Sequence, residues 1–508
     1  MPHPRRVLLA VLLLVLAPAL PALPAAAQEG PLAGLDGYIE RAMADWRVPG
    51  LAIAVVRNDS IIYERGFGVL ELGQPARVDE HTLFAIASTT KAMTAAALGT
   101  LVDEEKVAWD DPVSKHLPWF ALADPYVTHE LTVRDLLTHR SGLQRSDNLW
   151  IAGPFTREEV LRRARRLPAA SPFRTAYGYN NIMFIAAGEV AAAAAGMSWD
   201  DLVEQRLFGP LGMARSTTRM SVLRTRDNVA TPHTTVDGRV VPIELRDYDN
   251  IGGAGAAFSS AHDMAQWVRL HLGRGTFGGR EILKPATVDE LHTPQFVLRG
   301  DSVGARMFPS THFRAYGLGW FLRDYHGVKL VEHSGWLNWM RTQVGLIPER
   351  GIGVVAIANL GSSDLQLALM YRVLDALLGV EPTDWSAEYL ALQRRGEERA
   401  AAAQARDSTG RRIEGTRPSL AVAKYAGTYR SELYGDLALA LEDGRLVLTY
   451  APDYVADLEH WHYDTFRANW RRTGFGRAFV TFRLDRRAQV AALELDGFGE
   501  FTAVRQSR

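Results

Sequence analysis

Apolar residues recur with two different periods along the first three quarters of the chain, and the change between periods marks the expected elements. One apolar face over residues 35–46 predicts an amphipathic helix, whereas the unbroken apolar run 51–56 predicts a buried strand. Residues 90–270 have a mainly helical pattern with Pro- and Gly-rich loops. Strand patterns return late, in four short runs at 316–323, 328–332, 340–347 and 353–358.

A helix is predicted after the last of these strands, at 364–378, with Ser362 or Ser363 as its cap and Gly379 just past its end. Strands from both ends of the region therefore belong to one sheet, and the helical stretch between them forms a subdomain. The expected fold class is α/β in the α+β sense: an antiparallel sheet flanked by helices, plus a helical subdomain. We place this domain at residues 28–382.

The composition changes after this domain. Residues 393–405 are charged and rich in alanine, which predicts a helix, and 407–418 read as a polar linker with Gly and Pro. From 425 to 504 short apolar runs alternate with turns, and Asp443-Gly444 separates two of them in the manner of a hairpin. This pattern fits a small antiparallel barrel or sandwich. The boundaries that follow are a helical, charged linker at 383–418 and a small all-β barrel at 419–508.

The N-terminal residues have the pattern of an export signal. Arg5 and Arg6 precede an apolar run over 7–20, and a proline-interrupted stretch of small residues ends at Ala27. A membrane anchor is the alternative, but the apolar run is short for a span of ~20 residues. We expect residues 1–27 to be a signal peptide cut near Ala27, and the mature protein to be periplasmic or secreted. No other segment predicts a stable membrane span.

The composition argues against several functions. Basic residues number 57 and acidic residues 58, with no long basic run, so nucleic acid is not an expected partner. The chain contains no cysteine, which excludes thiol catalysis, thiolate zinc sites and iron–sulfur clusters. His460 and His462 share one face of a predicted strand, but no third ligand accompanies them. We expect structural histidines there, and neither a metal nor another cofactor.

Ser88-Thr89-Thr90-Lys91 stands at the start of an apolar helical stretch and can supply a nucleophile and a base. Residues i and i+3 share a helix face, so the Lys91 amine lies one turn from Ser88. A lysine acts as a base only if its pKa falls from ~10.4 to near ~7–8, about 4 kcal/mol of destabilisation of the charged form. Burial and the positive end of the helix dipole act in this direction. The alternative interpretation is a helix cap followed by a solvent-facing lysine.

Two further motifs contain residues suited to the same chemistry. Tyr179-Asn180-Asn181 has the form Tyr-x-Asn, in which a phenol can relay a proton and an amide can orient a lysine and a carbonyl. His333-Ser334-Gly335 closes a predicted strand, where glycine at an edge lets a substrate backbone approach. The next N–H, of Trp336, can serve as an oxyanion donor. Taken singly, these motifs are equally an aromatic turn before a helix and a strand end with a hydrogen-bonded histidine.

In this order and spacing, the Ser-x-x-Lys, Tyr-x-Asn and His-x-Gly motifs resemble those of the serine β-lactamase and penicillin-binding-protein superfamily. The likeness covers residues 30–380, and it includes 136–143 and Gly253-Ala254-Gly255. It is nearest to the class C-like branch, with its D-aminopeptidases, carboxylesterases and D,D-carboxypeptidases. Residues 425–429 and 458–466 are similar to the lipocalin-like domain of some of these hydrolases. There the domain can build oligomers or shield the active site, so the resemblance allows a homo-oligomer through it.

The resemblance implies a role for each motif residue. Ser88 attacks a carbonyl and forms an acyl-enzyme, while Lys91 and Tyr179 share the base and acid duties. Asn181 positions the lysine and the substrate. The N–H groups of Ser88 and Trp336 form the oxyanion hole.

One departure from the family pattern bears on the substrate. His333, followed by Ser334 and Gly335, stands where true β-lactamases carry the lysine of Lys-Thr-Gly, and a neutral histidine pairs less strongly with a carboxylate. We therefore expect an exported serine hydrolase that cleaves esters or peptide and amide bonds of small molecules, D-amino-acid peptides included. A true β-lactamase or D,D-carboxypeptidase is the enzymatic alternative. A penicillin-binding sensor without turnover is the alternative of another class.

Overall fold

The computed structural model describes residues 30–300, 302–381, 383–406 and 411–504. The predicted export signal with its cleavage near Ala27 lies outside the described residues. Within the described ranges no single helix is long and apolar enough to cross a membrane. One helix pair, Asn181–Ala195 with Trp199–Leu211, passes that test jointly by length and composition, with a 78° bend between its members.

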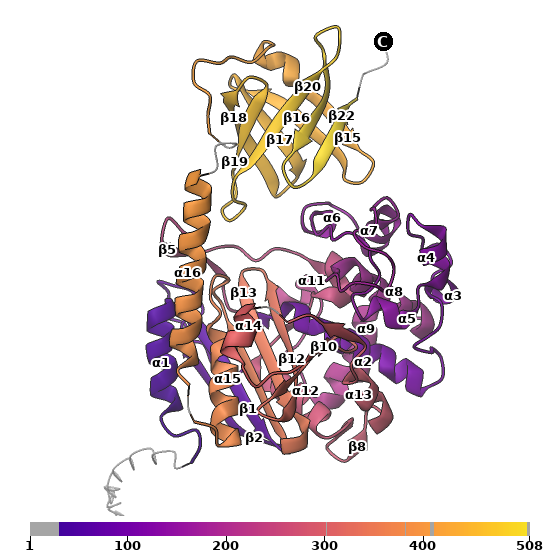
Figure 1. The fold of residues 1–508 in the computed structure, drawn as a ribbon, viewed down its shortest axis with the longest axis vertical. Helices are drawn as coiled ribbons and strands as arrows, with labels where there is room; N and C mark the ends of the chain where they lie inside the picture. The colour runs from indigo at the N-terminus through magenta and orange to yellow at the C-terminus, as the bar shows by residue number, and fades with distance from the viewer. Residues whose placement is uncertain (1–29, 301, 382, 407–410, 505–508) are drawn as a thin grey trace, which may run out of the picture.

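An antiparallel sheet of eight strands forms the centre of the larger part of the molecule (Figure 1). Two of its strands come from the beginning of this part and six from its end, as the apolar pattern predicted. Across the sheet the order is β2 (Ser60–Gly68), β1 (Gly50–Arg57), β14 (Ile352–Ala358), β13 (Met340–Ile347), β12 (Val328–Leu337), β11 (Phe321–Tyr325), β10 (Arg314–Tyr316) and β9 (Phe296–Leu298).

The central strands β1 and β14 are buried on both faces, which explains their unbroken apolar sequences. One face of the sheet packs against α1 (Leu35–Trp46), α15 (Leu365–Leu378) and α16 (Trp385–Arg406). The other face packs against α2 (Thr90–Asp103), α12 (Ala261–Leu272) and the helical subdomain. The sheet is therefore the middle layer of three, and the predicted α+β architecture is confirmed.

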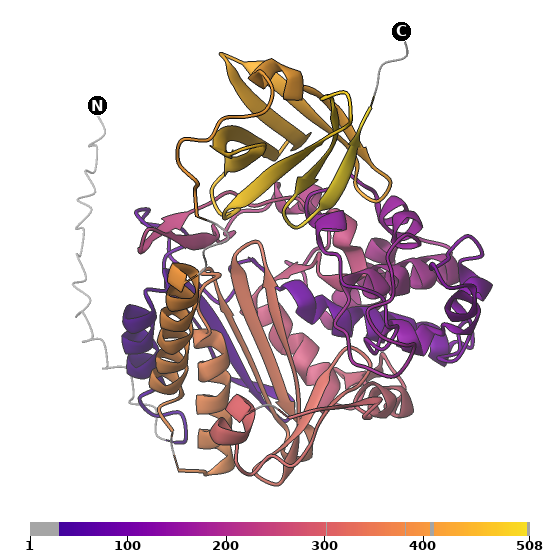
Figure 2. The same ribbon diagram turned by 45° about the horizontal axis from the view of Figure 1, so that its top comes forward.

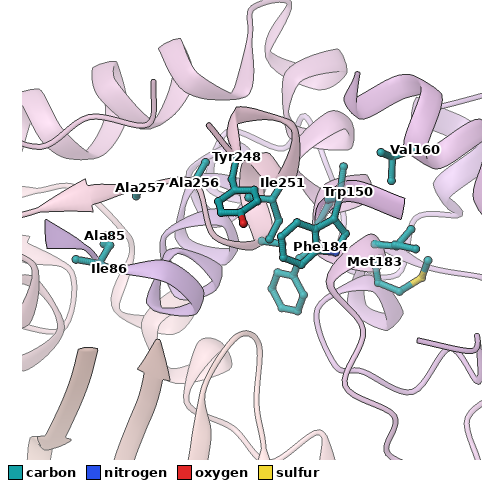
Figure 3. Packing of buried hydrophobic residues seen from close by; sticks show 14 of the residues in the cluster. Ala85, Ile86, Trp150, Val160, Met183, Phe184, Tyr248, Ile251, Ala256 and Ala257 are labelled. Carbon is teal, nitrogen blue, oxygen red and sulfur yellow. The ribbon is translucent and has the colours of Figure 1, made fainter. Parts of the chain in front are cut away.

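The helical subdomain surrounds one apolar helix, α8 (Asn181–Ala195). Figure 3 shows its side chains Met183 and Phe184 packed near Trp150, Ile251 and Tyr248. Short helices complete the described part of this region and of the segment that leads back to the sheet: α3 (Val113–His116), α4 (Pro125–Glu130), α5 (Val133–Leu136), α6 (Asn148–Ile151), α7 (Arg157–Ala164), α9 (Trp199–Val203), α10 (Gly209–Leu211), α11 (Met220–Leu223), α13 (Pro285–Leu291) and α14 (Ser302–Met307).

Two predicted strand boundaries are wrong. The run 316–323 is two strands, because Gly317 N–H donates to the Trp320 carbonyl at 2.8 Å and closes a turn between β10 and β11. His333-Ser334-Gly335 does not end a strand, since β12 continues to Leu337 and stays paired with β13. However, β11 accompanies β12 only as far as Glu332, so the last residues of β12 have no strand on that side.

The C-terminal part is a closed antiparallel barrel, which confirms the predicted all-β architecture. Asp443 and Gly444 both have positive φ, 46° and 75°, as a two-residue hairpin turn requires. In order, the strands are β15 (Gly427–Ser431), β16 (Gly435–Glu442), β17 (Arg445–Ala451), β18 (Tyr454–His462), β19 (Thr465–Trp470), β20 (Ala478–Leu484), β21 (Val490–Leu495) and β22 (Gly499–Ala503).

Helix α16 links the two parts and is anchored to the first of them. It begins at Trp385, before the predicted start at 393, because its first turn packs on the core. Trp385 Nε1 donates to Asp375 at 2.6 Å, and Trp46 Nε1 donates to Ser386 Oγ at 3.0 Å. From the end of α16 the chain reaches the barrel, which lies across one end of the sheet and the adjacent helices (Figures 1 and 2).

Candidate active site

Ser88 and Lys91 lie where a short 3₁₀ turn, Ala87–Thr89, runs into α2. The Lys91 side chain is fully buried, and its Nζ lies 3.0 Å from Ser88 Oγ and 2.6 Å from the Ala254 carbonyl oxygen. Burial holds the pKa of the Lys91 amine well below its usual range, and Arg145 adds to this effect while Asp147 opposes it. Burial therefore favours the neutral form of an amine that lies in contact with a serine hydroxyl.

The backbone around Ser88 and Lys91 is fixed from two sides. Ala87 has a φ of 51°, a left-handed conformation that costs a residue with a Cβ about 1–2 kcal/mol. On the other side, Thr94 Oγ1 donates to the Gly253 carbonyl at 2.7 Å. A Cβ at Gly253 would lie 2.8 Å from the Phe184 carbonyl oxygen, so glycine lets this segment come close enough for Ala254 to reach Lys91.

Tyr179 lies beside the same pair. Lys91 Nζ is 4.9 Å from the centre of its ring. Burial raises the pKa of the Tyr179 phenol above its usual range, and hydrogen bonding to Ser88 offsets this only in part. The phenol is therefore protonated at neutral pH. It can donate a proton to a leaving group, whereas Lys91 is the group able to accept one.

His139 holds the segment that carries Tyr179. The two rings lie 4.2 Å apart, centre to centre. The His139 carbonyl accepts from Gly178 N–H at 2.8 Å, and its Nδ1 accepts from Asn180 N–H at 3.0 Å. Asn180 in turn caps α8 by accepting from Ile182 N–H. His139 is fully buried with a φ of 56°, and burial keeps its pKa well below the usual value.

Asn181 is in the site, but its side-chain amide donates to Asp147 and not to Lys91. Its Nδ2 donates to Asp147 Oδ1 at 3.0 Å, and its buried Oδ1 has no partner among the described residues. Asp147 also accepts from Arg145 Nε at 2.6 Å and from Trp150 Nε1 at 2.9 Å. Asp147 thus accepts hydrogen bonds from an amide, a guanidinium and an indole, and no sequence motif identified it as a site residue.

His333 lies on β12 with both ring nitrogens engaged. Nδ1 donates to the Ser334 carbonyl at 2.7 Å, and Nε2 lies 3.1 Å from the Tyr316 hydroxyl. Because Nδ1 carries the proton, Nε2 of the neutral ring accepts from that hydroxyl. Burial, with Lys91 nearby, lowers the pKa of His333 to about 3. This histidine is uncharged and cannot replace a lysine as the partner of a carboxylate.

The structure gives glycine at position 335 a packing role that the sequence analysis did not predict. A Cβ at this position would lie 2.2 Å from the Ile86 carbonyl oxygen. Glycine therefore lets the strand pack directly against the segment that leads into Ser88, rather than making room for a substrate. Ser334 and Trp336 on either side are exposed, and Trp336 is 59% exposed.

A cavity of about 570 Å³ joins these residues. Of the predicted site residues, Ser88, Tyr179, Asn181, His333, Ser334 and Trp336 line it, while Lys91 and Gly335 lie behind its surface. The barrel closes the cavity with eight residues that sequence analysis did not connect to the site: Tyr454, Trp470, Gly474, Phe475, Arg477, Ala478, Asp496 and Phe498. Across the described ranges, no group of three or more His, Asp or Glu side chains is placed to hold a metal ion.

Comparisons with known proteins agree with this geometry. The β-lactamase family profile matches residues 35–377, and the profile of a domain of unknown function, DUF3471, matches 411–506. Unguisins hydrolase ungD of Aspergillus violaceofuscus is 31% identical over 477 residues, covering 85% of this chain and 83% of that protein. Penicillin-binding protein 4 of Amycolatopsis lactamdurans is 29% identical over 349 residues, covering 66% of this chain and 87% of that protein.

Solved structures share the fold over nearly the whole chain. The octameric penicillin-binding protein homologue from Pyrococcus abyssi superposes with a TM-score of 0.62 at 22% identity, covering 92% of this chain and 98% of that one. SurE superposes with a TM-score of 0.56, also at 22% identity and with the same coverage. Because the family profile spans more than half of the chain, this protein belongs to the β-lactamase family, within the β-lactamase- and penicillin-binding-protein-like serine hydrolases, with an eight-stranded C-terminal barrel.

Proposed function

We propose that this hydrolase works through an acyl-enzyme on Ser88 and cleaves ester or peptide and amide bonds. The observation that carries the proposal is the contact between the buried Lys91 amine and Ser88 Oγ at 3.0 Å, with the Ala254 carbonyl fixing the amine from behind. Only a neutral amine can take the serine proton, and burial favours that state.

In the first step, Lys91 accepts the hydroxyl proton while Ser88 Oγ forms a bond to the substrate carbonyl carbon. The N–H groups of Ser88 and Trp336 stabilise the oxyanion. The tetrahedral intermediate collapses as Tyr179 gives its proton to the leaving alcohol or amine, and Lys91 returns a proton to Tyr179. Water then attacks the ester on Ser88 with Lys91 as base, and release of the acid restores the serine.

The environment of His333 favours esters and peptides over β-lactams. A β-lactam brings a carboxylate next to its ring, and the family pairs it with the lysine of Lys-Thr-Gly. Here the equivalent ring is neutral, with both nitrogens bonded to protein groups. Relatives named unguisins hydrolase support a hydrolase activity. D-amino-acid peptides belong to the proposed substrate range.

A substrate panel tests the proposal. Short esters, D-amino-acid amides and nitrocefin are offered to the wild-type protein and to Ser88→Ala. We expect turnover of an ester or amide that is lost in Ser88→Ala, with nitrocefin turnover far slower. Nitrocefin turnover as fast as that of the best ester would contradict the substrate proposal. Ligand binding without turnover of any substrate would favour a penicillin-binding sensor.

Export and assembly are further parts of the proposal. The N-terminal pattern supports a periplasmic or secreted protein, and N-terminal sequencing of the protein from its producing cells should begin at Gln28. A retained leader would contradict this. The octameric homologue from Pyrococcus abyssi supports a homo-oligomer, which light scattering of the purified protein tests directly.

A further inference from the structure

The cavity that contains Ser88 has an apolar wall whose side chains the mechanism does not use. We define the apolar wall as six residues: Trp336 and Leu337 at the end of β12, and Tyr454, Trp470, Phe475 and Phe498 of the barrel. Trp336 is 59% exposed, and Trp470, Phe475 and Phe498 are partly exposed. Exposed aromatic rings around a reactive serine offer contact area that only an apolar ligand group would fill.

The barrel half of the wall is fixed relative to Ser88. Arg246, which is 5% exposed, extends from the hydrolase part into the barrel, with its guanidinium 4.9 Å from the Tyr454 ring centre and 4.8 Å from that of Phe475. Asp453 lies 3.4 Å from its Nε. The Asn338 side chain bonds both the N–H and the carbonyl of Arg246, at 2.9 and 3.0 Å. These contacts fix the barrel residues of the apolar wall in position relative to the hydrolase part.

Most charged side chains that line the cavity are paired with other groups of the protein. Arg145 is paired with Asp147, and the Arg246 guanidinium is enclosed by rings and Asp453. His333 is neutral. Arg477 and Asp496 add one charge of each sign on the barrel side. A group held against the apolar wall therefore meets aromatic surface, and the three arginines near it are matched in number by Asp147, Asp453 and Asp496.

We infer that the substrate carries a bulky apolar side chain on the acyl side of the scissile bond, aromatic or branched aliphatic, and that Trp470 and Phe475 of the barrel contact it. The inference rests on the proposed function at Ser88. The end of β12 lacks a neighbouring strand past Glu332, so an extended peptide can lie along it and direct a side chain toward the barrel. The barrel is thereby a specificity element of the hydrolase.

The test uses three substrates with the same leaving group: p-nitrophenyl acetate and the p-nitrophenyl esters of N-acetyl-D-phenylalanine and N-acetyl-L-phenylalanine. Full-length wild type should prefer one of the bulky esters in kcat/KM. Trp470→Ala and, independently, Phe475→Ala should lower kcat/KM for that ester about ten- to a hundred-fold and leave the acetate ester within about two-fold. Trp461→Ala is the matched control, because Trp461 is also a barrel tryptophan but does not line the cavity.

The outcomes separate the inference from the proposed function. Ser88-dependent turnover with no preference for the bulky esters would overturn the inference alone. An equal loss on the acetate ester and on the preferred bulky ester in a folded Trp470→Ala would also overturn the inference. So would the absence of any loss in either variant. The absence of Ser88-dependent turnover of the acetate ester would overturn the proposed function as well. Thermal melting of each variant shows whether the barrel is intact.

Discussion

The two sides of the cavity are built in opposite ways. The catalytic floor, which we define as Ser88, Lys91 and Tyr179, is held by backbone carbonyls, hydrogen bonds and burial. The apolar wall consists of two residues at the end of β12 and four rings from a separate barrel, three of them partly exposed. The floor is thus organised to set protonation states, whereas the wall offers shape and apolar area. Under the proposed function, one side of the cavity sets the reaction type and the other sets the choice of substrate.

The largest expected effect comes from removing the amine from the floor. Lys91→Met keeps an unbranched apolar chain in a buried position but leaves Ser88 without a base. We expect kcat to fall about a thousand-fold or more for every substrate, esters with long and short acyl groups alike. Steady-state kinetics with melting curves as a folding control measure this. A variant that loses only the bulky substrates would break the division between floor and wall.

A smaller effect is expected from His139, which supports the floor without touching the cavity surface. His139→Asn keeps an acceptor for Asn180 N–H and tolerates the φ of 56°, whereas His139→Ala does neither. We expect His139→Ala to lower kcat about ten- to a hundred-fold with little change in KM, and His139→Asn to retain more of the activity. If both variants change KM alone, His139 belongs to substrate binding instead.

The smallest effect is a shift in pH dependence. In the proposed mechanism catalysis needs neutral Lys91, so the acidic limb of the kcat/KM profile should follow the pKa of its amine. Asp147 raises this pKa and Arg145 lowers it. Asp147→Asn should therefore move the acidic limb to lower pH, and Arg145→Gln should move it to higher pH. Shifts in the same direction, or none, would show that the limb does not report Lys91.

The floor was predictable because its key spacing is local. Ser88 and Lys91 are three residues apart on one helical turn, so the pair forms wherever that helix forms. Tyr179 and His333 were found as motifs whose order along the chain resembles a family. The residues that contact these motif residues in the folded protein were harder to predict from the sequence. The Ala254 carbonyl reaches Lys91 only because the 3₁₀ segment Asp249–Ala254 packs across α2 and α8, a contact that no local pattern encodes.

The wall was not predictable for a related reason. Trp470 ends a strand pattern like those of the barrel's own core aromatics, and Phe475 lies in the loop before β20. Only the docking of the barrel through Arg246 places both in the cavity. The sequence shows many aromatic residues between 425 and 504. It does not show which surface of the hydrolase part they face. Similarly, the reason for Gly335 became clear only from the approach of Ile86.

The central claim is that Ser88 becomes covalently acylated. The most direct measurement is intact-mass spectrometry of the wild-type protein after acid quench during turnover of an ester, followed by peptide mapping. The account predicts a mass increase equal to the acyl group, located on the peptide that contains Ser88 and absent in Ser88→Ala. Turnover with no adduct at any quench time, or an adduct on another residue, would contradict the account.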